Sequence, residues 1–324
     1  MARVRAQVVQ LDRGLPLVKT PDGALVRCKH ATALVKEGNV RAVVGDWVQV
    51  VLDDDADIAQ IAEVESRTRA FVRKDPAERQ LPQTLAANFD TVIVAHPLHE
   101  LNVRRLEREL VLAHETGAAV VVALTKADLA QDGRTEGDLA LVRHIVADDV
   151  RVLVVSSEDS ESVEELRACV PEGTVAVLIG RSGVGKSSLV NLLAGRDVQQ
   201  TTPVRETDGK GRHTTVNRAM ITIERGGSVV DMPGVRGLGL WGADAGIAAA
   251  FPDVVELARG CRFRDCTHGE EPGCALAKAV EEGRLRPERL ESYRHLAEEN
   301  EAQKLKREEA ARLATRGRKR RKRS

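Results

Sequence analysis

The sequence has few aromatic residues, no long apolar run and only five cysteines. With seven Phe, Trp and Tyr residues among 324, bases stacked on aromatic side chains are not expected to dominate any nucleic-acid binding. The longest apolar run, residues 117–124, is too short to cross a bilayer. The first ten residues alternate in polarity and lack a signal peptide's apolar stretch. Scattered cysteines in odd number argue against a disulfide framework. We therefore expect a cytoplasmic protein that contacts no membrane.

The charge of the chain is unevenly distributed. Residues 303–324 carry eleven Lys or Arg and two Glu, a net charge of +9, so the rest of the chain carries −9. The segment 316–324 reads RGRKRRKRS, which cannot fold by itself because like charges repel and no apolar side chain is present. Two interpretations stay open for this tail: an arm that binds RNA or DNA phosphates, or a tail that keeps the protein soluble.

The first seventy residues predict a small β domain. Polar and apolar residues alternate at 6–11 and 24–28, and a further strand is expected at 43–51. Short strands at this spacing are typical of a five-stranded barrel of the OB type. From about residue 79 the pattern changes to buried strands at 91–95, 118–124, 152–155 and 175–179, alternating with amphipathic helices. This alternation predicts an α/β domain with a parallel sheet covered by helices on both faces.

The strongest motif is GRSGVGKS at residues 180–187, which matches G-x-x-x-x-G-K-[ST]. A predicted strand precedes it and a helical pattern at 188–194 follows it, the context that a phosphate loop requires. Backbone N–H groups of such a loop surround the β-phosphate at the start of the helix. We expect Lys186 to neutralise the β- and γ-phosphates and Ser187 to ligate Mg²⁺. The predicted phosphate-binding residues are Gly180, Arg181, Ser182, Gly183, Val184, Gly185, Lys186, Ser187 and Ser188.

Two segments that follow predicted strands indicate guanine as the base. A carboxylate at Asp128 can accept hydrogen bonds from the N1–H and N2–H₂ groups of guanine, a donor pair that adenine lacks. Asp128 is therefore expected to select GTP over ATP. Ser156 and Ser157 fit a loop whose backbone contacts guanine O6. The guanine motif comprises Thr125, Lys126, Ala127 and Asp128.

A third segment, DMPG at residues 231–234, follows a predicted strand at 227–230. Asp231 can hold Mg²⁺, and the N–H group of Gly234 can sense the γ-phosphate. In an ordinary small GTPase the phosphate loop comes first and the guanine motif later. Here the guanine motif precedes the phosphate loop, and the DMPG segment comes last. This order predicts a circularly permuted GTPase domain, whose γ-phosphate loop runs on into the C-terminal region.

Three features of the sequence point to a known family: the permuted motif order, the segments RHTT (212–215) and DMPGVR (231–236), and the Cys/His spacing at 261–274. In these features the sequence resembles the ribosome small-subunit-dependent GTPase A family (RsgA/YjeQ). The resemblance spans nearly the whole chain. It implies a GTPase that acts late in maturation of the small ribosomal subunit, is stimulated by that subunit, and binds its ribosomal RNA. It also implies an OB-type barrel at 1–72, the permuted GTPase domain at 73–240, and a zinc-binding helical domain at 241–314. The basic tail at 315–324, predicted to be disordered from its composition, is longer than the family leads us to expect. Thr125 departs from the family, which usually has Asn there.

Cys261, Cys266, His268 and Cys274 follow the spacing C-x₄-C-x-H-x₅-C. Three thiolates and one imidazole complete a tetrahedral ligand set and leave no position for a substrate water. The sequence therefore predicts one structural zinc ion. Cys28 and Cys169 are isolated and are expected to be ordinary packing residues.

The segment 197–215 is rich in Thr, Gly and charge, and we interpret it as the first switch loop. Thr215 is the expected magnesium ligand, and Thr214 stays open as the alternative. Many GTPases place a water-orienting Gln just after Asp-x-x-Gly, but this position holds Val235, whose apolar side chain cannot orient water. His213 is the nearest catalytic candidate and agrees with the family pattern. An ordinary loop histidine stays open as the other interpretation.

The sequence leaves three other functions open. The first is an RNA-binding or RNA-chaperone protein in which the nucleotide is only structural. The second is a P-loop phosphotransferase, against which the guanine motif argues. The third is a permuted GTPase that acts on a different RNA or ribosomal particle. No extended heptad pattern is present, so we expect a monomer that binds GTP and GDP.

Overall fold

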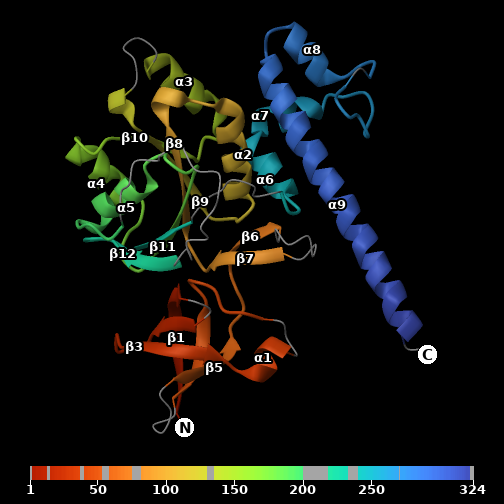
Figure 1. Cartoon of the computed structure of the whole chain (residues 1–324). Coiled ribbons are helices and arrows are strands. Elements are labelled where there is room, and N and C mark those ends of the chain that lie inside the picture. The colour runs from red at the N-terminus through yellow and green to blue at the C-terminus, as the bar shows by residue number, and fades with distance from the viewer. Residues whose placement is uncertain are drawn as a thin grey trace, which may run out of the picture.

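The computed structural model of the chain describes residues 2–12, 15–36, 40–52, 58–74, 82–129, 135–199, 218–232, 240–269 and 271–321. Three modules are arranged in space: a barrel at the bottom of Figure 1, a helix-covered sheet above it, and C-terminal helices at the side. Within these residues, no helix combines the length and the apolar character that a membrane crossing needs.

The N-terminal module is a closed five-stranded barrel. Its strands are β1 (Ala2–Asp12), β2 (Leu15–Lys19), β3 (Leu25–His30), β4 (Trp47–Leu52) and β5 (Ala59–Val64), with helix α1 (Thr32–Lys36) after β3. The order β1-β2-β3-β5-β4 closes because β4 pairs back onto β1. Side chains at alternate positions, among them Val8, Val48 and Ile61, are fully buried inside the barrel. The predicted OB-type barrel is confirmed.

The second module is a six-stranded sheet in the order β10-β9-β8-β11-β13-β12. All neighbours are parallel except β12, which runs antiparallel to β13. The strands are β8 (Thr91–Pro97), β9 (Ala119–Thr125), β10 (Arg151–Val155), β11 (Val175–Ile179), β12 (Arg218–Thr222) and β13 (Ser228–Asp231). The helical elements are η1 (Leu98–Glu100), α2 (Val103–His114), η2 (Ala127–Leu129), α3 (Thr135–Ile145), α4 (Ser160–Ala168) and α5 (Lys186–Ala194).

Helices cover both faces of this sheet, as the alternation of strands and helices predicts. On β8, Val92 and Val94 belong to the same apolar cluster as residues of α2 and α3. Ile93 and Ala95, which point to the opposite face, pack with residues of α4 and α5. Strands β8, β9 and β11 are buried on both sides, and their residues therefore read as nearly continuous apolar runs.

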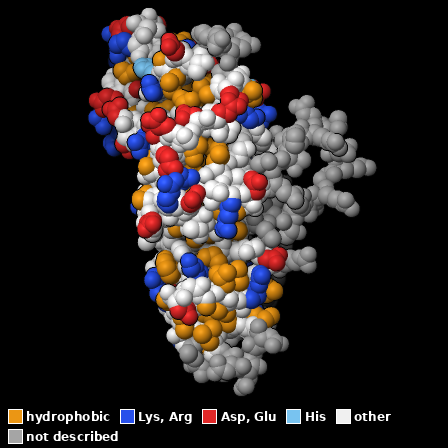
Figure 2. Space-filling model, turned by 90° about the vertical axis from the view of Figure 1, so that its left-hand side faces the viewer, with side chains coloured by type: hydrophobic (Ala, Val, Ile, Leu, Met, Phe, Trp, Pro, Cys, Tyr) orange, Lys and Arg blue, Asp and Glu red, His pale blue; other side chains and the backbone are white. Residues whose placement is uncertain are grey.

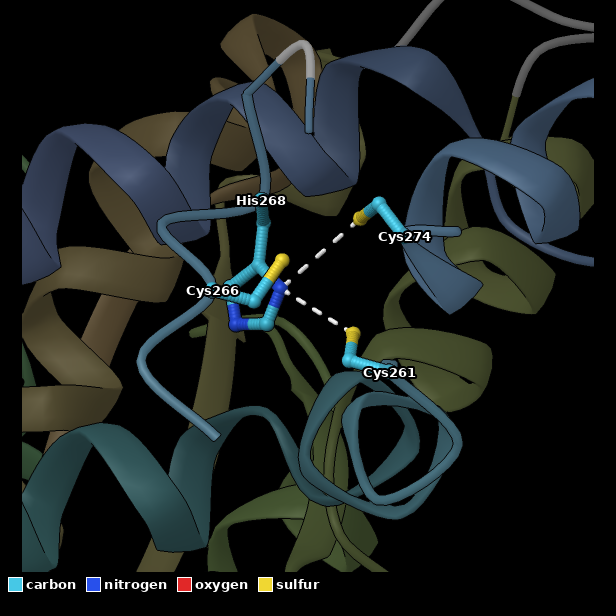
Figure 3. A group of neighbouring side chains, drawn as sticks. All are labelled: Cys261, Cys266, His268 and Cys274. Carbon is cyan, nitrogen blue, oxygen red and sulfur yellow. Dashed lines mark hydrogen bonds between the residues drawn. The ribbon is translucent and has the colours of Figure 1, made fainter. Parts of the chain in front are cut away.

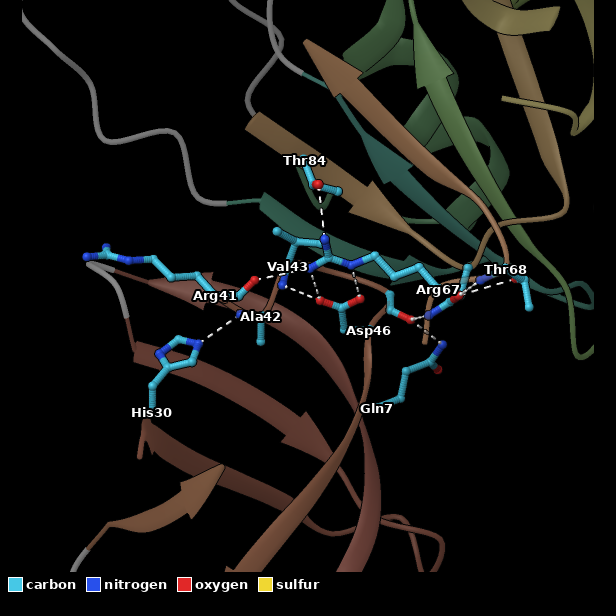
Figure 4. A network of polar contacts seen from close by, with 11 residues as sticks. Gln7, His30, Arg41, Ala42, Val43, Asp46, Arg67, Thr68 and Thr84 are labelled. Atoms are coloured by element: carbon cyan, nitrogen blue, oxygen red, sulfur yellow. Dashed lines mark hydrogen bonds and ion pairs between the residues drawn. The ribbon is translucent and has the colours of Figure 1, made fainter. Parts of the chain in front are cut away.

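The barrel is joined to the sheet by a strand pairing, and to the hairpin that precedes the sheet by an ion pair with a buried carboxylate. The end of β1 pairs with the start of β12, with Gln10 opposite Ala219. Arg67, just before the hairpin β6 (Ala70–Lys74)–β7 (Pro82–Ala87), binds both oxygens of the buried Asp46 at 2.8 and 2.7 Å. Its third nitrogen donates to Thr84 on β7 at 3.0 Å (Figure 4). Arg67 thus connects the barrel to the hairpin that leads into β8.

The face of the molecule that Figure 2 shows is mixed in character. On the face shown in Figure 2, apolar side chains gather over the lower part, where the barrel lies, and charges of both signs are interspersed above it. Leu25 on β3 is an exposed barrel residue, with 61% of its surface accessible. Among the described residues of this face there is no continuous basic stripe of the kind that would follow a nucleic-acid backbone.

The C-terminal module consists of α6 (Asp244–Ala250), α7 (Pro252–Ala258), α8 (Ala275–Glu281) and the long helix α9 (Pro287–Arg321). Its centre is the buried guanidinium of Arg289, which binds Glu107 of α2 at 2.8 Å and Asp253 of α7 at 2.8 Å. The guanidinium also lies over the Phe251 ring, 4.2 Å from its centroid. Since Glu107 belongs to the sheet module, this cluster fixes the C-terminal helices onto α2.

Helix α9 is longer than the sequence predicts. Its backbone is helical through Arg321, whereas the sequence predicts a helical end near Ala314 and an unfolded basic tail from residue 315. Propagating an existing helix avoids the cost of nucleation, and Arg, Lys and Ala are strong helix formers. The packed start of α9 therefore extends the helix into the basic segment.

We expect Arg67→Met to lower the free energy of unfolding by about 3 kcal/mol, because it leaves the fully buried Asp46 carboxylate without its ion-pair partner. Urea denaturation followed by circular dichroism measures this change. Arg27→Met serves as the control, since Arg27 and Asp12 are 3.8 Å apart and well exposed. That control should change stability by less than about 0.5 kcal/mol. Equal losses in the two variants would contradict the role given to Asp46.

Candidate functional site

The predicted phosphate loop follows β11 and ends where α5 begins at Lys186. Gly180, Gly183 and Gly185 all have positive φ angles, of 146°, 84° and 100°. A Cβ atom on Gly180 would lie 2.4 Å from the carbonyl oxygen of Ala95 on β8, so no side chain fits at this position. The loop therefore depends on glycine both for its conformation and for its close approach to the neighbouring strand.

The loop presents positive charge at the start of α5. The N-cap residue of α5 is Gly185, which has no side chain to accept a hydrogen bond. The N–H groups of the first turn of α5 therefore point toward the loop without a capping side chain. The Lys186 ammonium is largely buried and donates to the carbonyl oxygens of Gly180 and Arg181 at 2.9 and 3.1 Å. Burial lowers the pKa of Lys186, while the charges of Asp231 and Glu109 oppose that shift. This arrangement can bind an anion such as a phosphate.

Asp231 lies next to the phosphate loop because β13 pairs with β11, with Asp231 opposite Leu178. Its Oδ1 atom is buried and has no hydrogen-bond partner within the described residues. Burial raises the pKa of this carboxyl, and Lys186 opposes the rise. A buried carboxylate oxygen without a partner fits a hard cation, and the half-buried hydroxyl of Ser187 lies on the first turn of α5. Asp231 and Ser187 are therefore the described residues that could hold Mg²⁺.

The guanine motif is tied to the phosphate loop by a direct hydrogen bond. The buried hydroxyl of Thr125, at the end of β9, donates to the carbonyl oxygen of Val184 at 2.6 Å. Lys126 follows with a positive φ of 56°, and η2 then carries Ala127 and the exposed Asp128. The structure therefore brings together two segments that lie more than fifty residues apart in the sequence.

The second predicted base-binding segment also lies at this edge of the sheet. Ser156 and the exposed Ser157 follow β10, which pairs with β9. The Ser156 N–H group donates to the Ser162 hydroxyl at 3.2 Å, and that hydroxyl donates to the Asp159 carbonyl at 2.8 Å. These contacts attach the loop to the start of α4. Four of the site residues predicted from the sequence lie outside the described residues: His213, Thr214, Thr215 and Gly234.

The predicted zinc ligands form a compact group, in which the candidate ligand atoms of Cys261, Cys266, His268 and Cys274 all lie within 4.8 Å of one another (Figure 3). The Nδ1 atom of His268 is 3.5 Å from Cys261 Sγ and 3.9 Å from Cys274 Sγ. Three thiolates and one imidazole make a closed tetrahedral set suited to a structural zinc ion.

The loop that carries these ligands is held by Glu271. Its carboxylate accepts hydrogen bonds from the N–H group of Thr267 at 2.9 Å and from that of Gly269 at 2.7 Å, on both sides of His268. It also binds the Thr267 hydroxyl. Together these contacts lower the pKa of Glu271 to about 2. Glu271 thus holds the backbone on both sides of the candidate ligand His268. Cys28 and Cys169 lie outside the ligand group, as the sequence predicts.

Sequence reasoning does not find His96, which is buried at the end of β8 beside the phosphate loop. Its ring contacts the equally buried Glu109 of α2, with Nδ1 and Oε2 3.0 Å apart. One signal was available: His96 is the only ionisable residue in the otherwise apolar segment TVIVAHP. A single histidine in an apolar run is more often a packing residue, so the sequence alone could not assign it to the site.

Comparison with known proteins decides the family, because the RsgA GTPase family model matches residues 64–241, more than half of the chain. The chain belongs to the RsgA GTPase family. It is therefore a GTP-hydrolysing enzyme, and the predicted resemblance and the predicted permuted fold are confirmed.

Relatives of this RsgA-family chain cover most of its length. The small ribosomal subunit biogenesis GTPase RsgA of Streptomyces avermitilis is 44% identical over 91% of this chain and 79% of its own. The protein of the same name from Methanosarcina acetivorans is 37% identical over 88% and 77% of the two chains.

Solved structures show the same fold. The crystal structure of YjeQ from Thermotoga maritima matches with a TM-score of 0.68 and 25% identity, over 92% of this chain and 99% of that one. YloQ, described as a circularly permuted GTPase, matches with a TM-score of 0.65 and 22% identity, over 93% and 96%.

We expect Gly180→Ala to weaken GDP binding at least about tenfold, since the new methyl group would collide with the Ala95 carbonyl oxygen and displace the loop. Titration with a fluorescent GDP analogue measures the Kd. Gly137→Ala on α3 is the matched control, because a Cβ atom there meets nothing within 4 Å. Unchanged affinity in Gly180→Ala would show that the loop does not need this close approach.

Replacing one ligand of the Cys/His group should release the metal. We expect purified wild-type protein to contain about one zinc ion per chain and Cys274→Ser to lose most of it, with a lower unfolding temperature. Elemental analysis and thermal unfolding measure both effects. Cys169→Ser is the control, because Cys169 lies outside the group. Zinc-free wild-type protein that is as stable as the zinc-loaded protein would rule out a structural metal.

Proposed function

We propose that this RsgA-family GTPase acts late in the assembly of the small ribosomal subunit, binds its ribosomal RNA, and hydrolyses GTP faster when bound to that subunit. The relatives named as small ribosomal subunit biogenesis GTPases, at 37–44% identity over most of the chain, support the partner. The observation that carries the enzymatic part is the meeting of three loops at one sheet edge, with Thr125 hydrogen-bonded to Val184.

In this proposal the phosphate loop and α5 bind the β- and γ-phosphates. The first-turn N–H groups of α5 and the Lys186 ammonium neutralise the charge that develops on the phosphate oxygens. Ser187, Asp231 and Thr215 would hold Mg²⁺, with Thr214 as the alternative to Thr215. When bound, the ion would supply positive charge against the phosphates. The orphaned Oδ1 atom of Asp231 supports the assignment of that carboxylate.

The guanine base lies between the two loops that follow β9 and β10. Asp128 accepts hydrogen bonds from guanine N1–H and N2–H₂, Lys126 and Ala127 flank the base, and the Ser156–Ser157 backbone contacts O6. The hydrogen bond from Thr125 to Val184 keeps the base-binding and phosphate-binding parts at a constant separation. The Thr125 hydroxyl therefore links the two loops, even though this position lacks the Asn side chain that is usual in the family.

In hydrolysis, a water molecule forms a bond to the γ-phosphorus while the bond from that phosphorus to the β,γ-bridging oxygen breaks, which gives GDP and phosphate. The N–H group of Gly234 donates a hydrogen bond to the γ-phosphate, and His213 orients the attacking water. Val235 has no polar group for that task. The Cys/His group holds one structural zinc ion in the module that is fixed to α2.

Steady-state hydrolysis of GTP and ATP, each with and without purified small ribosomal subunits, tests this function. Without subunits we expect slow turnover of GTP, on the order of 10⁻⁴ s⁻¹, and no turnover of ATP. Small subunits should increase the GTP rate strongly. Large subunits serve as the control particle. Turnover that subunits do not change would contradict the partner, and equal use of ATP would contradict the guanine motif. Ribosomal RNA binding that Lys186→Ala leaves intact, together with normal assembly in cells, would favour an RNA chaperone.

Asp128→Asn should change the base preference from guanine to xanthine. The amide oxygen of asparagine still accepts from N1–H, but its NH₂ group faces the guanine NH₂, whereas xanthine offers a carbonyl oxygen at that place. We expect use of GTP to fall at least about a hundredfold and use of XTP to rise. Phosphate release from GTP and from XTP, together with direct calorimetric titration of each nucleotide, measures the change. Loss of GTP binding without any gain for XTP would argue that Asp128 does not contact the base.

A further inference from the structure

The imidazole of His96 connects the end of strand β8 to two points of helix α2. Its Nδ1 atom is 3.0 Å from Oε2 of Glu109, and its Nε2 atom accepts a hydrogen bond from the Asn102 N–H group at 3.2 Å. A backbone N–H group can only donate, so Nε2 carries no hydrogen and Nδ1–H donates to the carboxylate. Both side chains are almost fully buried, with 1% and 5% of their surfaces exposed.

The backbone at His96 supports both halves of the nucleotide site. The carbonyl oxygen of Ala95, the preceding residue, lies against Gly180 so closely that no Cβ atom fits between them. The carbonyl oxygen of His96 is 3.4 Å from the same Thr125 hydroxyl that binds Val184. A displacement of this strand end would therefore move both the Ala95 carbonyl, which contacts the phosphate loop, and the His96 carbonyl, which contacts Thr125 of the guanine motif.

Helix α2 is itself held from its other side, which makes it a firm support for the histidine. Glu107 forms the buried ion pair with Arg289 of α9, and Arg108 binds Glu299 of α9 at 2.6 and 2.7 Å. At the start of the helix, the side chain of Asn102 caps the N–H group of Arg105 at 3.0 Å. The His96 ring thus joins the strand end to an element whose position is already determined.

We propose that His96, held by Glu109 and Asn102, is a positioning residue for the nucleotide site, and that it sets the affinity for GDP and GTP by fixing the end of β8 under the phosphate loop and Thr125. This inference rests on the proposed function, because it assumes that the two loops bind a guanine nucleotide. An apolar residue of similar size would fill the space but would leave the Glu109 carboxylate and the Asn102 N–H group without these partners. The polar pair therefore specifies one position of the strand end, where packing alone would tolerate several.

The test compares His96→Leu, which removes both hydrogen bonds, with His96→Gln, whose amide can donate to Glu109 and accept from Asn102. We expect His96→Leu to raise the Kd for GDP and for GTP about tenfold, and His96→Gln to restore most of the affinity. Fluorescent nucleotide titration gives the Kd, and urea denaturation of the nucleotide-free protein gives the stability separately. Asn300→Leu is the matched control: Asn300 is also buried and makes two hydrogen bonds, but it lies in the C-terminal module.

The control should lose stability while its nucleotide Kd stays unchanged. If His96→Leu also loses only stability, with the wild-type Kd, His96 is a packing residue and the inference is wrong. If His96→Leu does not fold, His96→Asn decides in its place, because its shorter amide can reach only one of the two partners. An unchanged Kd in that variant would likewise overturn the inference. If the wild-type protein itself binds no guanine nucleotide, the proposed function fails first.

Discussion

The pairing of β8 with β11 is the constraint on which the nucleotide site depends. Strand β8 pairs on one side with β11, which leads to the phosphate loop, and on the other side with β9, which leads to the guanine motif. All the loops then emerge at the carboxyl edge of one sheet, where ligands of open α/β sheets bind. The order of the segments along the chain does not affect this arrangement, because only the strand neighbours decide which loops meet. A permuted chain can therefore build the site of an ordinary GTPase.

Helix α2 links this site to the C-terminal module. One side of the helix supports the end of β8 through Glu109, and the other side is bound by α9 through the Arg289 cluster. Burying a guanidinium is costly unless its hydrogen bonds are satisfied, and here two carboxylates, one carbonyl oxygen and an aromatic face satisfy them. The Cys/His group belongs to the same module, so a metal there would stabilise the helices that hold α2 in place.

The sequence predicted the parts of this structure that arise from local patterns. The buried strands, the phosphate loop and the helix after it follow from apolar runs and glycine spacing, and the Cys/His group follows from four close ligands. It could not predict contacts between distant segments. Neither the pairing of β1 with β12 nor the ion pair of Asp46 with Arg67 leaves a pattern in the chain, and a single histidine in an apolar strand resembles many packing residues. The helical backbone beyond residue 314 was missed because composition describes the isolated segment rather than a helix that is already nucleated.

The pairing of β1 with β12 also bears on how the chain folds during its synthesis. Strand β1 leaves the ribosome early, but its partner at Ala219 follows only after about two hundred more residues, which at typical rates takes on the order of ten seconds or more. The barrel can close before then, because its own strands are all made by residue 64. At Gln10 and Leu11, the end of β1 can pair with β2 early, but its pairing with β12 forms only after β12 has been synthesised. The pairing that attaches the barrel to the nucleotide sheet is therefore a late step during synthesis. Its rate is limited by the time of translation and by the large sequence separation of the two strands.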